Sequence, residues 1–195
     1  MGKQELGETV AQGAIHETLG DWRDLTGRIH AIDLQSEQGK EEVLVITLAD
    51  AAPGDEAAVA ALCTELDEFY GSLPEGGPEE RAAQVRDVLF GDPPLAHALV
   101  AWDGQAPAGF AAYSFLWPTV GLTASLYLKE LYVAEAYRRA GVGRLLMDGL
   151  YDVARRRGLS RVEWTTDTSN VRAQAFYESL GATSLASKIF YRVVP

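Results

Sequence analysis

The stretch that most constrains the fold runs from residue 125 to residue 150, where a strand pattern, a glycine-bearing turn and a helix pattern follow one another. Residues 126–133 are rich in Leu, Tyr and Val, a composition typical of a mostly buried strand. Farther on, apolar residues recur every three or four positions, at Val142, Leu146, Leu150 and Val153. That spacing places them on one face of a helix, so the fold must pass from a buried strand through a tight turn into an amphipathic helix.

The turn between this strand and this helix has the features of a phosphate-binding site. Gly141 and Gly143 let the backbone approach a ligand oxygen closely. The unpaired N–H groups at the start of the helix and the positive end of its dipole point at the same place. Because Arg138 and Arg144 add positive charge, we expect the turn to bind an anion.

Length and composition indicate an ordinary globular chain. Its 195 residues suit one domain, and an apolar fraction of 47% is typical of soluble proteins. The single cysteine, Cys63, lies in a helical pattern, where we expect a buried structural thiol, and it cannot form an internal disulfide. No stretch of 18 apolar residues and no N-terminal hydrophobic signal core is present, so we expect a cytoplasmic protein without membrane association.

A formal net charge of −11 argues against nucleic acid as a partner, because such a chain repels phosphate backbones. An acidic surface suits a cationic substrate. His16 and His30 have no cysteine or third histidine near them in the sequence, so we expect surface histidines and no metal site.

The order of the predicted elements indicates one mixed α/β domain. Residues 1–42 are expected to form an N-terminal extension, partly helical or disordered, before a domain of residues 43–195. Strands are predicted at 42–48, 97–102, 109–117, 126–133, 161–166 and 189–194, and helices at 56–69, 79–90, 143–157 and 171–180. This order predicts an antiparallel meander that leads into a βαβ unit.

Two motifs carry a family resemblance. Arg138, Gly141 and Gly143 after an antiparallel strand, followed by Asn170 and the segment 175–182, resemble the GNAT superfamily of acetyl-CoA-dependent N-acetyltransferases. Within it the chain is most similar to diamine (spermidine/spermine) acetyltransferases. The resemblance implies a central mixed, mostly antiparallel sheet flanked by helices, acetyl-CoA as co-substrate, a small-molecule amine acceptor and a homodimer. Dinucleotide and P-loop patterns are incomplete or absent.

The resemblance also implies the cofactor contacts. The pantetheine arm would follow main-chain groups at a splay between two parallel strands, and the pyrophosphate would lie on the glycine turn. Asn170 is predicted both to contact the arm and to cap the following helix. The implied acetyl-CoA contacts are Leu131, Tyr132, Val133, Arg138, Arg139, Ala140, Gly141, Val142, Gly143, Arg144, Asn170 and Tyr177.

Tyr177 matches the family's tyrosine that serves as the acid for the departing thiolate. With an ordinary pKa near 10, its hydroxyl is predicted to protonate that anion. Tyr191 and Tyr132 are weaker candidates for the same role.

The chain departs from the family at the base for the substrate ammonium, because the family presents two adjacent carboxylates where this chain has Lys129 and Glu130. Glu130 is the predicted base, and deprotonation by water or by another acidic side chain stays open. Adjacent residues of a strand point to opposite faces, so Glu130 would not simply replace the missing carboxylate.

The acceptor site is expected among the first helices, the loop that begins at Tyr70, and the hairpin that ends at Trp117, with Lys129 and Glu130 at its mouth. Lys129 would either pair with a carboxylate near Asp67 or favour an acceptor that carries an anionic group. The Trp117 ring could hold a cationic chain.

The predicted reaction moves an acetyl group from acetyl-CoA to a primary amine of a small molecule, directly within a ternary complex. Other acceptors, such as an aminoglycoside-type antibiotic or a protein N-terminus, and a non-catalytic acetyl-CoA-binding regulatory module remain alternatives.

Overall fold

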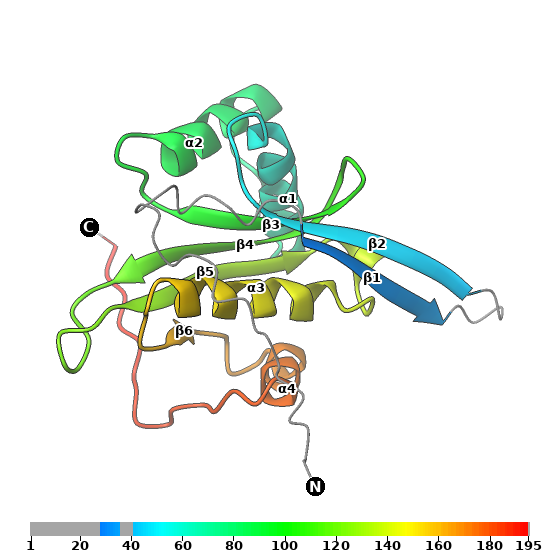
Figure 1. Ribbon diagram of the computed structural model, residues 1–195. Coiled ribbons are helices and arrows are strands. Elements are labelled where there is room, and N and C mark those ends of the chain that lie inside the picture. Colours follow the sequence, from blue (N-terminus) through cyan, green and yellow to red (C-terminus); the bar gives the residue numbers. More distant parts are fainter. Residues whose placement is uncertain (1–27, 36–40, 195) are drawn as a thin grey trace, which may run out of the picture.

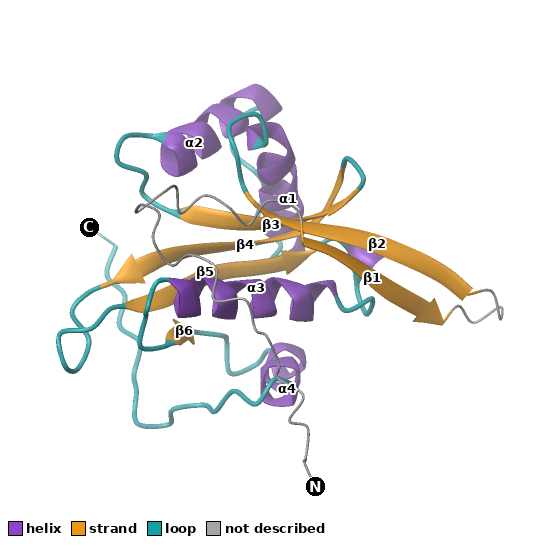
Figure 2. Ribbon diagram, in the orientation of Figure 1, coloured by secondary structure: helices purple, strands orange, loops and turns teal. Residues whose placement is uncertain are grey.

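The computed structural model describes residues 28–35 and 41–194, and it contains one six-stranded sheet in the strand order β1-β2-β3-β4-β5-β6 (Figure 1). The first five strands pair antiparallel, and β5 pairs with β6 in parallel (Figure 2). The mixed, mostly antiparallel sheet predicted from the sequence is confirmed. The elements are β1 (Arg28–Gln35), β2 (Glu41–Asp50), α1 (Glu56–Phe69), α2 (Pro78–Phe90), β3 (His97–Asp103), β4 (Ala106–Leu116), β5 (Ser125–Val133), the 3₁₀ turn η1 (Glu135–Tyr137), α3 (Val142–Arg156), β6 (Val162–Trp164) and α4 (Val171–Ser179).

Helix α3 covers one face of the sheet, and the core on this face is tightly packed (Figure 1). Leu146 and Leu150 of α3 are completely buried, as the helical spacing predicted. Gly149 permits the close approach, because a Cβ atom there would lie 2.6 Å from a methyl carbon of Leu48 and 2.9 Å from one of Leu99. The glycine therefore allows α3 to lie directly on strands β2 and β3.

Helices α1 and α2 cover the opposite face, and this layer is looser. Val59 and Leu62 of α1 are buried against Phe110 and Tyr132 of the sheet. Helix α2 has no buried residue and contributes half-buried side chains such as Val85. The two faces of the same sheet thus differ in how completely a helix fills them.

A β-bulge interrupts β5 at Lys129. Ala112 pairs with Glu130 and the next residue, Tyr113, pairs with Leu128, so β5 has one residue more than β4 at this point. Leu128 packs in the core under α3, whereas Tyr132 packs in the cluster under α1. A bulge re-aims the side chains of its strand. The expected separation of residues 129 and 130 onto opposite faces does not hold here, since their side chains meet in an ion pair of 2.6 Å.

Both ends of the chain differ from the prediction. Residues 28–35, expected in a helical or disordered extension, form strand β1, whose register with β2 is continuous; residues 1–27 lie outside the described residues. The predicted closing strand at 189–194 is wrong: these residues form no strand in the structure, and Ile189 and Val193 are 74% and 86% exposed. Their alternating pattern suits a strand, but a strand forms only where a neighbour accepts its backbone hydrogen bonds.

Candidate active site

Strands β5 and β6 run together for only a short distance before they separate. Their parallel pairing joins residues 126–128 to residues 162–164, after which β6 ends and β5 continues to Val133. The backbone of residues 129–133 therefore extends beyond its neighbour on one side. Backbone groups at such an edge can pair with an extended polar ligand.

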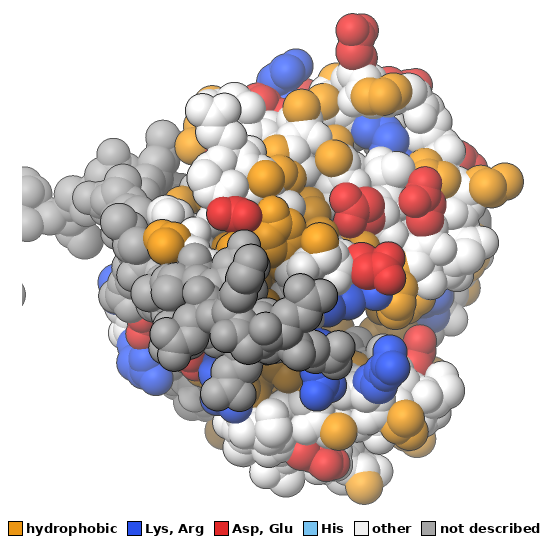
Figure 3. Space-filling model, turned by 90° about the vertical axis from the view of Figure 1, so that its right-hand side faces the viewer, with side chains coloured by type: hydrophobic (Ala, Val, Ile, Leu, Met, Phe, Trp, Pro, Cys, Tyr) orange, Lys and Arg blue, Asp and Glu red, His pale blue; other side chains and the backbone are white. Residues whose placement is uncertain are grey.

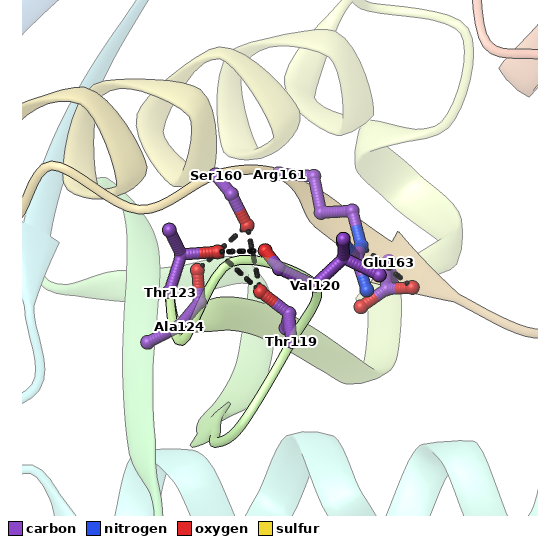
Figure 4. A network of polar contacts seen from close by, with 7 residues as sticks. All are labelled: Thr119, Val120, Thr123, Ala124, Ser160, Arg161 and Glu163. Carbon is purple, nitrogen blue, oxygen red and sulfur yellow. Dashed lines mark hydrogen bonds and ion pairs between the residues drawn. The ribbon is translucent and has the colours of Figure 1, made fainter.

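A network of hydroxyl groups fixes the opposite end of this strand pair (Figure 4). Thr119 in the turn before β5 bonds Thr123, and its Oγ1 lies 3.3 Å from Oγ of Ser160 in the loop before β6. The Ser160 hydroxyl also donates to the Ala124 carbonyl at 2.9 Å. The strands are thus joined at their beginnings and open at their ends, which gives the separation a fixed position.

The turn after β5 leads into the N-terminus of α3, where backbone N–H groups have no partner within the helix. Two of its residues, Arg139 and Gly141, have left-handed backbones with φ of 68° and 85°. The bond from the Leu145 N–H to the Gly141 carbonyl, 3.0 Å, is the first turn of α3, so the N–H groups of residues 142–144 precede the helical ladder. Such an arrangement at a helix N-terminus favours an anion, in agreement with the sequence prediction.

The arginines near the turn also have partners within the protein. Arg138 donates from Nε to the Val133 carbonyl (3.1 Å) and from Nη2 to the Tyr132 hydroxyl (3.3 Å), and its guanidinium carbon lies 5.0 Å from the centre of the Phe69 ring. Arg138 therefore ties the turn to β5 and α1. Arg144 Nη2 reaches the Ser179 carbonyl at 3.4 Å.

The end of the sheet that carries this turn is basic and acidic in adjoining areas. On the face drawn in Figure 3, Lys and Arg side chains gather in the lower middle, below a row of Asp and Glu side chains. Arg138, Arg139 and Arg144 are exposed at the turn. Positive charge for an anionic ligand is therefore available beside carboxylates that would attract a cation.

Helix α4 is held against the N-terminus of α3 by two features. The Asn170 side chain accepts a hydrogen bond from the Ala173 N–H at 3.0 Å, so the predicted N-cap is confirmed. A Cβ atom on Gly143 would lie 3.3 Å from the tip of the Phe176 ring, tighter than nearly all real contacts. Gly143 thus admits Phe176, and with it α4, close to the phosphate-binding turn.

Tyr177 lies on α4 between the aromatic rings of Trp164 (5.0 Å between centroids) and Phe176 (5.2 Å). Burial is the largest cause that raises the pKa of Tyr177 to about 12, and the nearby Tyr70, Glu130 and Tyr151 contribute to this rise. Because Tyr70 and Glu130 both act on the pKa of Tyr177, the three side chains lie in one region of the molecule.

This raised pKa bears on the predicted role of Tyr177. It makes proton transfer from Tyr177 to a thiolate less favourable than it would be from an ordinary tyrosine. The acid role of Tyr177 stays a prediction. A hydroxyl that stays protonated at neutral pH is also suited to donate a hydrogen bond to a developing negative charge.

Lys129 pairs with its neighbour Glu130 rather than with Asp67, whose carboxylate binds Arg81 Nη2 at 2.7 Å. Tyr70 lies in the same area: burial raises its pKa first, and the charges of Glu130 and Asp167 raise it further. Asp167 was missed in the sequence analysis. Its position three residues before Asn170 places it next to a predicted site residue. This proximity in the sequence was the only indication, because a single carboxylate in a loop forms no recognisable pattern.

Three predicted residues lie away from this cluster or have other partners. Trp117 follows β4, whose end pairs with the beginning of β5 at Ser125, roughly 16 Å along the strand from Glu130. Its Nε1 donates to the Leu122 carbonyl at 3.3 Å. The Tyr132 hydroxyl donates to Glu65 at 3.2 Å, and Tyr191 is 84% exposed.

The family model described as the acetyltransferase (GNAT) family matches residues 59–182, which include this turn, the open strand pair and Tyr177. The chain belongs to the GNAT family of acetyltransferases. It is therefore an acyltransferase that uses acetyl-CoA, as predicted from the sequence. The described residues contain no helix that could span a membrane and no group of His, Cys, Asp or Glu that could hold a metal ion.

Similar proteins within this family have several names. The chain is 29% identical to the thialysine N-epsilon-acetyltransferase of Bos taurus over 72% of this chain and 85% of that protein. It is 30% identical to an aminoglycoside N(6')-acetyltransferase type 1 of Serratia marcescens over 61% and 83%. Identity to the L-ornithine N5-acetyltransferase NATA1 of Arabidopsis thaliana is 36%, but the match spans 38% of this chain and only 33% of that protein's length.

Solved structures support the fold. An integron cassette protein from the mobile metagenome of V. cholerae superposes with a TM-score of 0.71 over 77% of this chain and 93% of that one, at 24% identity.

Proposed function

We propose that the protein transfers the acetyl group of acetyl-CoA to a primary amine of a small molecule, directly within a ternary complex. The observation that supports the proposal is that Glu130 lies close enough to Tyr177 for its charge to raise the pKa of that tyrosine, where β6 has ended and β5 continues. The names of the thialysine and aminoglycoside acetyltransferases that the chain resembles support an amine acceptor.

Acetyl-CoA would bind along features that its polar groups fit. Its pyrophosphate would accept hydrogen bonds from the N–H groups of residues 140–144, where Gly141 has a left-handed backbone. Its pantetheine amides would form hydrogen bonds with the backbone of residues 131–133, on the side of β5 where β6 has ended. It supplies a thioester whose carbonyl carbon accepts the amine.

Glu130 and Tyr177 would assist the attack of the amine on that carbonyl carbon. Glu130 would accept the proton of the substrate ammonium. Nζ of Lys129 lies 2.6 Å from Oε1 of Glu130 and competes with the substrate for the carboxylate. Water is the alternative proton acceptor. The amine nitrogen forms the new C–N bond as the C–S bond breaks, and it releases its second proton to water. Tyr177 would donate a hydrogen bond to the departing sulfur, and water would supply the proton that the thiolate finally takes. Holding both reactants in place contributes much of the rate.

The release of free CoA thiol with a panel of amines tests this function. Tyr177→Phe should lower kcat tenfold to a hundredfold while acetyl-CoA affinity, measured by calorimetry, stays the same. Glu130→Gln should also lower kcat, because the neutral amide cannot accept the proton of the substrate ammonium. Tight acetyl-CoA binding without CoA release for any amine would instead favour a regulatory module.

An aminoglycoside acceptor is the second candidate, because the aminoglycoside N(6')-acetyltransferase of Serratia marcescens matches 61% of this chain. Including an aminoglycoside in the same panel separates the two. Lys129→Glu belongs in the panel as well: a gain of polyamine acetylation would identify residue 129 as a determinant of specificity.

A further inference from the structure

A cavity of about 250 Å³ lies between α1, α2 and the face of strands β3 and β4. Its lining is almost entirely apolar, with Val59 of α1, Val85 of α2 and Phe110 of β4 among its side chains. The volume exceeds that of engineered apolar cavities that bind benzene. A small hydrocarbon group therefore fits inside it.

The charged group of this cavity already has a partner. Arg81 lines the cavity, and its Nη2 pairs with Asp67 at 2.7 Å. Its Nε is buried without a hydrogen-bond partner among the described residues. Because the guanidinium charge is balanced, the cavity has no free ionic group for a second charge on a ligand, and an ionic ligand group would lose its hydration there.

The cavity adjoins the residue proposed as the base. Ala112, which lines it, is the direct Cα partner of Glu130 across strands β4 and β5. Cys63 also lines it, and the charge of Glu130 is one cause of the raised pKa of that thiol. The apolar space thus begins next to the place where the amine would lose its proton.

We infer that the acceptor is a monoamine with an apolar body, and that this body occupies the cavity between α1, α2 and the sheet. The inference rests on the proposed function and adds the substrate class. Its amine would lie at Glu130, and its hydrocarbon chain or ring would extend beneath the two helices. A diamine of equal length would place a second ammonium group in an apolar space.

A series of amines tests the inference through kcat/KM. From ethylamine to hexylamine, kcat/KM should rise roughly three- to fourfold for each added methylene group, or about a hundredfold in total. Butane-1,4-diamine should react at least tenfold more slowly than butylamine. A flat series, or a diamine that reacts as well as the alkylamine, would overturn the inference while leaving the proposed function intact.

Filling the cavity supplies the matched variants. Val85→Phe should bring the hexylamine-to-ethylamine ratio of kcat/KM close to one, whereas Ala83→Leu adds bulk to the same helix outside the cavity and should leave the ratio unchanged. An unchanged ratio in Val85→Phe contradicts the inference.

Cysteine labelling gives a readout that does not depend on catalysis. In the unmodified chain, saturating hexylamine should slow modification of Cys63 by a small thiol reagent at least fivefold, and ethylamine should not. This measurement applies even if Val85→Phe fails to fold. No CoA release for any amine would refute the proposed function, and absent protection of Cys63 would refute the inference about the cavity.

Discussion

The two faces of the sheet solve different packing problems. On one face α3 buries eight of its 15 residues against the strands, and a glycine removes the last obstacle to contact. On the other face α2 buries none of its 13 residues, and a cavity of about 250 Å³ remains. Acetyl-CoA is the same in every reaction, and the turn proposed to bind it leads into the tightly packed helix α3. The side chains of the opposite face can vary without disturbing the packing of α3.

The largest expected effect breaks the tight face. Gly149→Leu would place side-chain atoms where Leu48 and Leu99 already lie, so we expect the free energy of unfolding to fall by about 3 kcal/mol. Ala83→Leu on the looser face should change it by less than about 0.5 kcal/mol. Urea unfolding of both variants measures the contrast, and similar losses would show that the two faces do not differ in tolerance.

The next largest effect is the slow chemical modification of Cys63, which lies on the looser face. Burial raises the pKa of its thiol to about 11, so its thiolate fraction at pH 8 is about two orders of magnitude below that of an ordinary cysteine. Modification by iodoacetamide at pH 8 should be slower than that of free cysteine by this factor. A rate close to that of free cysteine would mean that the thiol is not buried.

The same thiol predicts a pH dependence of stability. Its folded pKa is higher than its unfolded pKa, so its contribution is fully present below about pH 8.5 and is lost as the pH rises through about 11. Urea midpoints of the wild type and Cys63→Ala should therefore converge across this window. If their difference is constant from pH 8 to 11, the titration assigned to Cys63 is wrong.

A smaller effect concerns the phosphate-binding turn. Gly141 has φ of 85°, which costs an L-residue about 1–2 kcal/mol, so Gly141→Ala should lower the free energy of unfolding by that amount. Arg139 already has φ of 68° and should lose no stability on replacement by glycine. Thermal unfolding of both variants checks the pair, and a stable Gly141→Ala protein would argue against the left-handed turn.

The smallest effect concerns the helix that carries Tyr177. Asn170→Ala removes the side-chain acceptor of the Ala173 N–H and should cost about 1 kcal/mol of stability, whereas Asn170→Ser should restore most of it. Denaturation midpoints give the answer. Equal midpoints for the Ala and Ser variants would show that the cap contributes nothing.

Sequence alone predicted the elements whose signals are local. Helix α1 has the predicted bounds, Glu56–Phe69, and Asn170 is the predicted cap, because periodicity and capping depend on neighbouring residues. Strand β1 and the unpaired segment 189–194 were mistaken because a strand depends on a partner elsewhere in the chain. For the same reason the sequence could not indicate that Arg138 binds Tyr132 or that Asp167 lies near Tyr70.

The bulge at Lys129 adds one residue to β5 without changing which of its side chains face α3. Leu126, Leu128, Leu131 and Val133 all pack on the α3 side, although the extra residue shifts their numbering from even to odd. Without Lys129 these four side chains would alternate perfectly with Tyr127, Glu130 and Tyr132. A chain lacking this single residue should therefore keep its apolar pattern and gain a smoother sheet, and at the same time lose the local irregularity at which Glu130 is presented. The unfolding midpoint and the rate of CoA release of the Lys129 deletion can be compared with those of the unmodified chain. A stable deletion variant that releases no CoA would show that the extra residue is needed for catalysis but not for folding.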